Sequence, residues 1–289
     1  MRSEKEMLDL IMETARGDER IRAVLLNGSR ANPNAPRDPL QDFDVVYAVR
    51  DVAPFTRNLE WIKRFGEMMI LQMPDDMRDP PPPNDGRFAY LMQFADGNRI
   101  DLTICPLADL GGFAKDSLTV LLLDKDGLLE AVGPAEDRDY LPKTPTAKAF
   151  ADCCNEFWWI CPYVAKGLWR REIINAKYFL DNFLRNQLLK MIDWHIGVKT
   201  DFSVNPGKYG KYYRLHLEPE LWELLEKTYS DAEYGRAWDA LFAAGDAFRQ
   251  TAVPLAEHFG FEYPHGDDER VTVHLRHVRS LPGDAKGTY

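Results

Sequence analysis

Asn27-Gly28-Ser29-Arg30 and Asp42-Phe43-Asp44-Val45-Val46 are the two stretches that decide the fold of the first half of this chain. The first stretch ends a short apolar run of strand length, residues 21–26. The second opens a run rich in β-branched residues, residues 42–49, which predicts another strand. A polar segment that contains prolines lies between them. The sequence therefore predicts a strand, a tight turn, an irregular link and a second strand.

Two aspartates stand at the start of the second predicted strand. Because strand side chains alternate between faces, Asp42 and Asp44 should share one face, while Phe43 and Val45 turn into the core. Magnesium prefers oxygen ligands and commonly takes one or two carboxylates together with substrate phosphates. Asp42 and Asp44 are therefore the predicted metal ligands. We expect two magnesium ions, bound together with a nucleoside triphosphate.

A third aspartate lies in a predicted hairpin. Two strand-like runs, residues 88–94 and 99–105, flank Asp96-Gly97-Asn98, a strong turn signal because glycine and asparagine tolerate positive φ. This places Asp101 in an otherwise apolar strand, where an unpaired carboxylate is expensive. If the predicted strands are neighbours, the three aspartates converge.

The sequence leaves the role of Asp101 open. It is either a third ligand beside the metal or the base that takes the proton of an attacking hydroxyl, and we favour the base. The alternative is a purely structural salt bridge with Arg99 or Arg30.

Contacts to phosphate are predicted at the turn after the first strand. Gly28 leaves room for backbone N–H groups to face phosphate oxygens, Ser29 adds a hydroxyl, and Arg30 adds positive charge. A later loop between helical stretches carries Lys208 and Lys211, which we expect to reach the phosphates of the nucleotide. The competing interpretation of that loop is a solvated basic turn.

Length and composition predict two domains. The chain has 289 residues, of which 45% are hydrophobic and 28% charged, enough for two ordinary cores. The composition changes near residues 141–145, so we divide the chain into domains at 1–145 and 146–289. The expected class is α+β: a mixed sheet with flanking helices, followed by an all-helical domain. Further elements are predicted as follows: helices at 3–16, 57–65, 167–196, 218–229 and 231–259, and strands at 68–73 and 117–123. The last twenty-five residues give no signal.

Charge constrains the partner. The net charge is −10, and residues 1–146 carry 18 basic and 26 acidic residues, a net −8. Such a field attracts cations and repels polyanions, so a polycationic substrate is expected and a nucleic acid is not. No membrane contact is expected, because no apolar stretch approaches about 20 residues. The start of the chain lacks a secretory signal, which predicts a cytoplasmic protein. The four cysteines are expected to be buried hydrophobes.

The motif Asn27–Arg30 followed by Asp42-Phe43-Asp44 resembles the active-site motif of the polymerase-β-like nucleotidyltransferases. The wider chain resembles the aminoglycoside 6-adenylyltransferases. Stretches that carry this likeness are Tyr90-Leu91-Met92-Gln93-Phe94, Cys153-Cys154-Asn155-Glu156-Phe157-Trp158-Trp159 and Trp194-His195-Ile196-Gly197. The resemblance implies transfer of AMP from ATP to streptomycin, with a helical domain closing over a nucleotidyltransferase domain and the antibiotic bound between them.

An aminoglycoside is rich in ammonium, guanidinium and hydroxyl groups, so its pocket should offer carboxylates and aromatic walls. Glu172, Glu156 and Trp169 are the predicted substrate contacts. Pairing of Glu172 with a nearby arginine is the alternative. Asp181, which stands four residues from both Lys177 and Arg185, is expected to form an ordinary ion ladder.

Two other functions remain open at this stage. One keeps the fold and changes the acceptor to a nucleic acid or a nucleotide. The other is a non-catalytic module that only binds a nucleotide. The sequence leaves open whether the chain is a monomer or a homodimer, and whether the proline run Pro80–Pro83 borders a site or is a passive loop.

Overall fold

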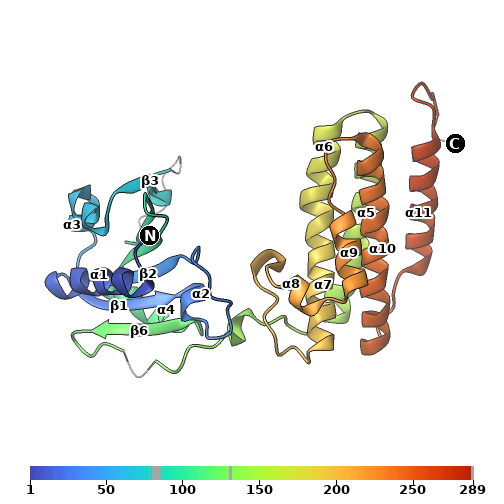
Figure 1. The fold of residues 1–289 in the computed structure, drawn as a ribbon. Coiled ribbons are helices and arrows are strands. Elements are labelled where there is room, and N and C mark those ends of the chain that lie inside the picture. The colour runs from blue at the N-terminus through green and yellow to red at the C-terminus, as the bar shows by residue number, and fades with distance from the viewer. Residues whose placement is uncertain (78, 80–85, 130–131, 288–289) are drawn as a thin grey trace. The chain divides into compact units, whose positions relative to one another are not determined.

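The computed structural model describes residues 1–77, 79, 86–129 and 132–287. The proline run at residues 80–83, for which the sequence left a site role open, lies outside these ranges. The chain divides into two compact units, Met1–Asp139 and Tyr140–Tyr289 (Figure 1). The sequence analysis set its domain boundary between residues 145 and 146, in the non-helical segment that precedes the first long helix of the second unit.

The first unit is built on a six-stranded mixed sheet with strand order β3-β4-β5-β2-β1-β6. The strands are β1 (Ile21–Asn27), β2 (Phe43–Val49), β3 (Met68–Gln72), β4 (Phe88–Phe94), β5 (Arg99–Pro106) and β6 (Thr119–Asp124). All neighbours pair antiparallel except β2 and β5, which are parallel. The predicted hairpin of β4 and β5 is confirmed by their antiparallel pairing.

Helix α1 (Glu4–Gly17) covers the sheet (Figure 1). It begins at a capping box, in which the Ser3 side chain accepts from the Glu6 backbone N–H and the Glu6 carboxylate accepts from the Ser3 N–H. Met7 and Ile11 are fully buried against β1 and β2. The hydroxyl of Tyr47 donates to the Ile11 carbonyl at 2.6 Å, which ties the helix to β2.

The remaining helices of this unit are short. They are α2 (Gly28–Ala31), α3 (Ala53–Thr56) and α4 (Leu110–Phe113), with 3₁₀ helices at Leu59–Phe65, Pro74–Met77, Leu107–Asp109 and Arg138–Tyr140. The helix predicted at 57–65 is a 3₁₀ helix, and it begins only after Asn58, whose side chain accepts from the Glu60 N–H.

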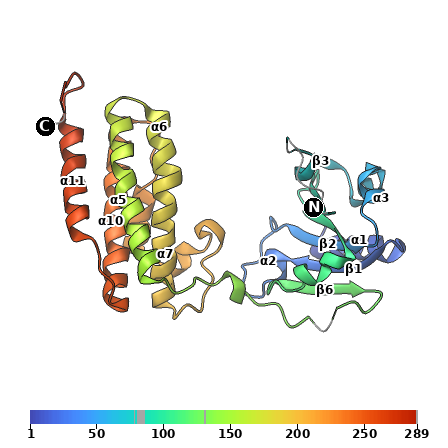
Figure 2. The ribbon, with the colours of Figure 1, turned by 180° about the vertical axis from the view of Figure 1, so that it is seen from behind.

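The second unit is helical. Its helices are α5 (Ala147–Trp169), α6 (Ile173–Tyr178), a π-helix (Phe179–Leu184), α7 (Arg185–Lys199), a 3₁₀ turn (Lys208–Gly210), α8 (Tyr213–His216), α9 (Pro219–Lys227), α10 (Tyr234–Phe259) and α11 (His265–Ser280). Figure 2 shows α5, α7, α10 and α11 running side by side. The rings of Phe157 on α5 and Phe248 on α10 stack in the core of this unit, with centroids 3.9 Å apart. The predicted class, an α+β unit with a mixed sheet followed by a helical unit, is confirmed.

Two helix predictions in this unit were wrong. The segment 167–196 is not one helix, because the chain breaks after α5, where Arg171 adopts a φ of +62°. The last twenty-five residues contain α11, which the sequence analysis missed. Only Leu275 and Val278 of its apolar residues are buried, so its apolar stripe is too narrow to stand out in a polar sequence.

All four cysteines are free and buried, as expected. Burial raises the pKa of each thiol above its usual range. In the described part of the chain, every helix is too short or too polar to cross a bilayer.

Candidate active site

The predicted alternation at the start of β2 is confirmed. Phe43 and Val45 are buried, with exposed fractions of 0% and 1%. Asp42, just before the strand, and Asp44, within it, are partly exposed on the other side. Both aspartates therefore lie where solvent and a substrate can reach them.

The sheet register brings three positions into line across three strands. Asn27, the last residue of β1, pairs with Asp44 of β2. On the other side of β2, Asp44 pairs with Asp101 of β5 in the parallel ladder. Paired positions on adjacent strands carry side chains on the same face at short range. Asp44 and Asp101, far apart in sequence, are thus neighbours in the sheet.

The turn after β1 is fitted to Asp44. Gly28 has a φ of +71°, a conformation that L side chains rarely adopt. A Cβ built on Gly28 would lie 2.2 Å from Oδ2 of Asp44. The absence of a side chain at position 28 therefore lets the carboxylate rest against the backbone of the turn.

Arg99 holds two of the aspartates together. Its Nε and Nη2 donate to the two carboxylate oxygens of Asp101 at 2.7 and 2.8 Å, and its Nε lies 3.7 Å from Oδ2 of Asp42. The hydrogen bond with Asp101, and then the charges of Asp101, Asp42 and Asp44, raise the pKa of Arg99. The structure thus contains the salt bridge that the sequence analysis weighed as the alternative for Asp101. What the sequence did not show is that the same guanidinium also reaches Asp42.

Arg30 is directed at the segment before β2. Its guanidinium is buried, donates to the carbonyls of Gln41 and Asp42 at 2.7 and 3.1 Å, and lies 3.8 Å from the ring centroid of Phe43. Burial lowers its pKa. The sequence analysis expected this charge to face phosphate. In the structure it fixes the backbone that carries Asp42, a role that the sequence did not suggest.

Two further contacts hold the turn in place. The side-chain amide of Gln41 donates to the Ser29 carbonyl at 3.4 Å, which links the turn to the start of β2. The Asn27 amide donates to the Thr119 hydroxyl on β6 at 2.8 Å. Its Oδ1 is buried without a hydrogen-bond partner among the residues that the structure describes. The strand end before Gly28 is therefore anchored on both sides.

The donor set fits a hard divalent cation in part. Across the described residues, no three His, Cys, Asp or Glu side chains are grouped so as to hold a metal by themselves. Yet Asp42, Asp44 and Asp101 surround the cationic guanidinium of Arg99, and the turn beside Asp44 has no side chain to obstruct an approaching group. Magnesium needs only one or two carboxylates when phosphates complete its shell. The residues present are therefore suited to magnesium bound together with a nucleotide.

The predicted residues of the second unit do not share one pocket. Glu172 is exposed at the start of α6 and lines a shallow hollow with Arg171, Ile174 and Tyr178. Glu156 is half-buried on α5 and lines neither this hollow nor the one beside Trp169. The ion ladder expected at Asp181 is confirmed by contacts of 3.0 Å to both Lys177 and Arg185.

Trp169 lines a different hollow, one with a cationic wall. Lys166, Arg170 and Lys286 are among the residues around it, and none of its lining residues is a carboxylate. A polycation would be repelled there. We therefore leave Trp169 out of the proposed aminoglycoside contacts.

The loop with the two lysines is exposed. Lys208 and Lys211 both face solvent, and Lys208 lies 5.1 Å from the ring centroid of Tyr209. Tyr209 itself has a positive φ of 59° and is 85% exposed. Among the residues that the structure describes, neither lysine pairs with a carboxylate. The contact of these lysines with nucleotide phosphates stays a prediction.

A mixed sheet that gathers carboxylates at one end, beside a glycine turn without a side chain, is the arrangement of a nucleotidyltransferase. Comparison with known proteins narrows this class. The model of the streptomycin adenylyltransferase family matches residues 1–278. The chain belongs to this family.

Individual relatives agree over nearly the whole length. The aminoglycoside 6-adenylyltransferase of Bacillus subtilis (strain 168) is 41% identical over 270 residues, which cover 93% of this chain and 95% of that protein. The enzyme of the same name from Campylobacter jejuni is 42% identical over 270 residues, 93% of each chain. A crystal structure of an aminoglycoside 6-adenyltransferase from Bacillus subtilis is 36% identical, covers 97% of this chain and 100% of that one, and gives a TM-score of 0.48.

Proposed function

We propose that this protein transfers AMP from ATP to a hydroxyl of an aminoglycoside such as streptomycin and releases pyrophosphate. Membership of the streptomycin adenylyltransferase family supports the reaction. One observation supports the choice of catalytic residues: the register of the sheet sets Asp44 beside Asp101, and Gly28 lies against Asp44.

Asp42, Asp44 and Asp101 are the residues that would hold magnesium. The chemistry that magnesium supplies when bound is neutralisation of charge on the α-phosphate and on the departing pyrophosphate. Gly28 and Ser29 offer backbone N–H groups and a hydroxyl to the phosphates at the end of β1. Arg99, which contacts Asp42 and Asp101, holds their carboxylates in place before substrate arrives.

In the transfer, the acceptor hydroxyl oxygen forms a bond to the α-phosphorus while the bond from that phosphorus to the oxygen of the departing pyrophosphate breaks. The hydroxyl proton goes to a base, for which Asp101 is the candidate. Because Asp101 accepts two hydrogen bonds from Arg99, that pair must loosen for the carboxylate to take a proton. Its alternative role is that of a third metal ligand. In either role the residues act by position and charge.

Two observations support an aminoglycoside as the acceptor: the net charge of the chain and the names of its relatives. A chain with net charge −10 favours a cationic acceptor. Glu172 and Glu156 are the carboxylates of the helical unit that we propose for it. Lys208 and Lys211, exposed on their loop, are proposed to contact the ATP phosphates.

The test is release of pyrophosphate from ATP by the full chain, with magnesium and with streptomycin as acceptor. Release that depends on both streptomycin and magnesium is expected. Release with RNA but not with streptomycin would establish the nucleic-acid alternative. Nucleotide binding without release in any mixture would establish a non-catalytic module.

A further inference from the structure

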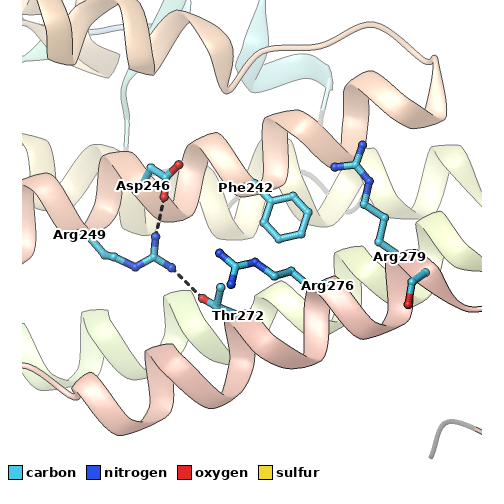
Figure 3. A pocket seen from close by; sticks show the side chains of 7 residues that line it. Phe242, Asp246, Arg249, Thr272, Arg276 and Arg279 are labelled. Atoms are coloured by element: carbon cyan, nitrogen blue, oxygen red, sulfur yellow. Dashed lines mark hydrogen bonds and ion pairs between the residues drawn. The ribbon is translucent and has the colours of Figure 1, made fainter.

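The helical unit contains a hollow of about 400 Å³ between α10 and α11 (Figure 3). None of the residues that line it belongs to the candidate active site. The lining residues are Phe242, Asp246 and Arg249 from α10, and Thr272, Arg276, Arg279 and Ser280 from α11.

The residues of each helix are spaced so that they face the hollow together. On α10 the spacings are four and three residues, and on α11 they are four, three and one. Residues three and four apart lie on the same face of a helix. Figure 3 shows Arg249, Thr272 and Arg276 beside one another between the helices, while the side chain of Arg279 extends in a different direction from that of Arg276. The three arginines therefore line the same hollow.

Three arginines line this hollow, and carboxylates pair with two of them: Asp246 and Asp268 with Arg249, and Asp239 with Arg279. The carboxylate of Asp246 accepts from Nη1 of Arg249 at 2.6 Å. Arg249 is further committed to the carboxylate of Asp268, at 2.8 to 3.0 Å, and to the hydroxyl of Thr272 at 2.7 Å. These contacts fix Arg249 in place, with its charge paired by two carboxylates and its hydrogen bonds largely used.

The other two arginines have donors to offer. Within the described ranges, Arg276 makes no hydrogen bond or ion pair, and its guanidinium is turned toward the space beside Arg249. Arg279 pairs with Asp239 at 2.8 Å, but that carboxylate is 68% exposed. An exposed pair of this kind contributes little, so Arg279 can exchange it for another anion.

We propose that this hollow binds a small phosphate-bearing anion, with Arg276 and Arg279 as its direct ligands. The planar guanidinium of each of these two arginines matches two phosphate oxygens at once. Bound phosphate also relieves the repulsion between arginines that stand three residues apart on α11. The half-buried ring of Phe242, stacked on Trp238 with centroids 6.2 Å apart, forms an apolar wall for the rest of the ligand. This site is independent of the proposed AMP transfer.

Calorimetric titration of the full chain with inorganic pyrophosphate, and separately with AMP, tests the proposal. EDTA in the buffer suppresses magnesium-dependent binding at the aspartates of the first unit. Wild type is compared with Arg276→Gln, with the double variant Arg276→Gln/Arg279→Gln, and with Arg270→Gln. The last is the matched control, because Arg270 is an exposed arginine of the same helix that pairs with Asp267 and does not line the hollow.

Saturable binding is expected for wild type, with about tenfold weaker affinity in Arg276→Gln and none in the double variant. Arg270→Gln should bind as wild type does, and so should Asp44→Asn, since the ligand does not sit at the aspartates. Tighter binding of AMP would identify a nucleotide as the source of the phosphate, and tighter binding of pyrophosphate would identify the free anion. Equal weakening by Arg276→Gln and Arg270→Gln would overturn the proposal, as would the absence of saturation at millimolar ligand. Circular dichroism of each variant, without ligand, verifies the fold.

Discussion

Gly28 and Asp44 fit against each other so closely that a Cβ on the glycine would lie 2.2 Å from Oδ2 of the aspartate. The glycine lies in the turn that is proposed to face phosphate, and the aspartate lies on the neighbouring strand β2. A side chain at position 28 must displace the carboxylate. The contact therefore couples the geometry of the turn to the position of a proposed metal ligand.

The first prediction is that Gly28→Ala abolishes pyrophosphate release while the protein still folds. The positive φ costs an alanine about 1 kcal/mol, and displacement of Asp44 removes a ligand. Gly127→Ala is the matched control, because Gly127 has a φ of +62° with nothing within 4 Å of the added Cβ. It should lose similar stability, measured by urea unfolding, and keep its activity. Near-normal activity of Gly28→Ala would contradict the importance of the contact.

The second prediction concerns the charges at β2. Asp42→Asn and Asp44→Asn should each lower kcat by about 100- to 1000-fold, because each removes a carboxylate charge proposed to hold magnesium without changing the shape of the side chain. Thermal unfolding should be nearly unchanged. Asp9→Asn, at an exposed carboxylate that pairs with Lys5, is the control and should be fully active. A variant at 42 or 44 that turned over normally would remove that residue from the proposed metal site.

The third prediction distinguishes the Arg99 guanidinium, which contacts the aspartates, from the magnesium proposed to bind them. Arg99→Gln leaves Asp42 and Asp101 without their guanidinium, so in EDTA the protein should lose about 1 kcal/mol of unfolding free energy. Magnesium should then raise Tm more in this variant than in wild type. Arg87→Gln, which breaks a comparable ion pair with Asp109 at 2.9 Å, should show no such magnesium effect. An identical response of both variants to magnesium would place the metal elsewhere.

The fourth prediction concerns pH. Burial, followed by the charge of Lys199, lowers the pKa of His195 from 6.5 to about 4. Between these values the unfolded chain binds a proton that the folded chain does not, so stability is lost as the pH falls from 6.5 toward 4. His195→Gln should flatten the unfolding free energy over this window. His258→Gln, at an exposed histidine, is the control and should leave the pH dependence of the unfolding free energy unchanged. If His195→Gln kept the wild-type pH dependence as well, His195 would not be its source.

The sequence predicted most of the sheet, for identifiable reasons. A short apolar run located β1, a run rich in β-branched residues located β2, and Asp96-Gly97-Asn98 located the hairpin of β4 and β5. Pairing between strands that are distant in sequence gives no local signal. The parallel contact between β2 and β5, which makes Asp44 and Asp101 neighbours, therefore emerged only from the structure.

The chemistry of the site was only partly foreseeable. The residue types and order at 28, 42, 44 and 101 suggested a phosphate and metal site. The contact of Arg99 with Asp42 crosses strands, and the use of Arg30 to hold backbone carbonyls depends on its burial. In the helical unit, the cations around Trp169 include Lys286, over one hundred residues away in the sequence. No spacing rule detects such neighbours.

The place of β2 between β1 and β5 has a consequence for how this protein can diverge. Residues 32–41 form an irregular link, so small changes in its length can be absorbed there without altering the order of residues within a strand. A single insertion within the first residues of β2 would instead exchange the two faces of the strand, turning Asp44 inward and Phe43 to water. Descendants of this chain should therefore vary in length before residue 42 and hardly at all from there to residue 49.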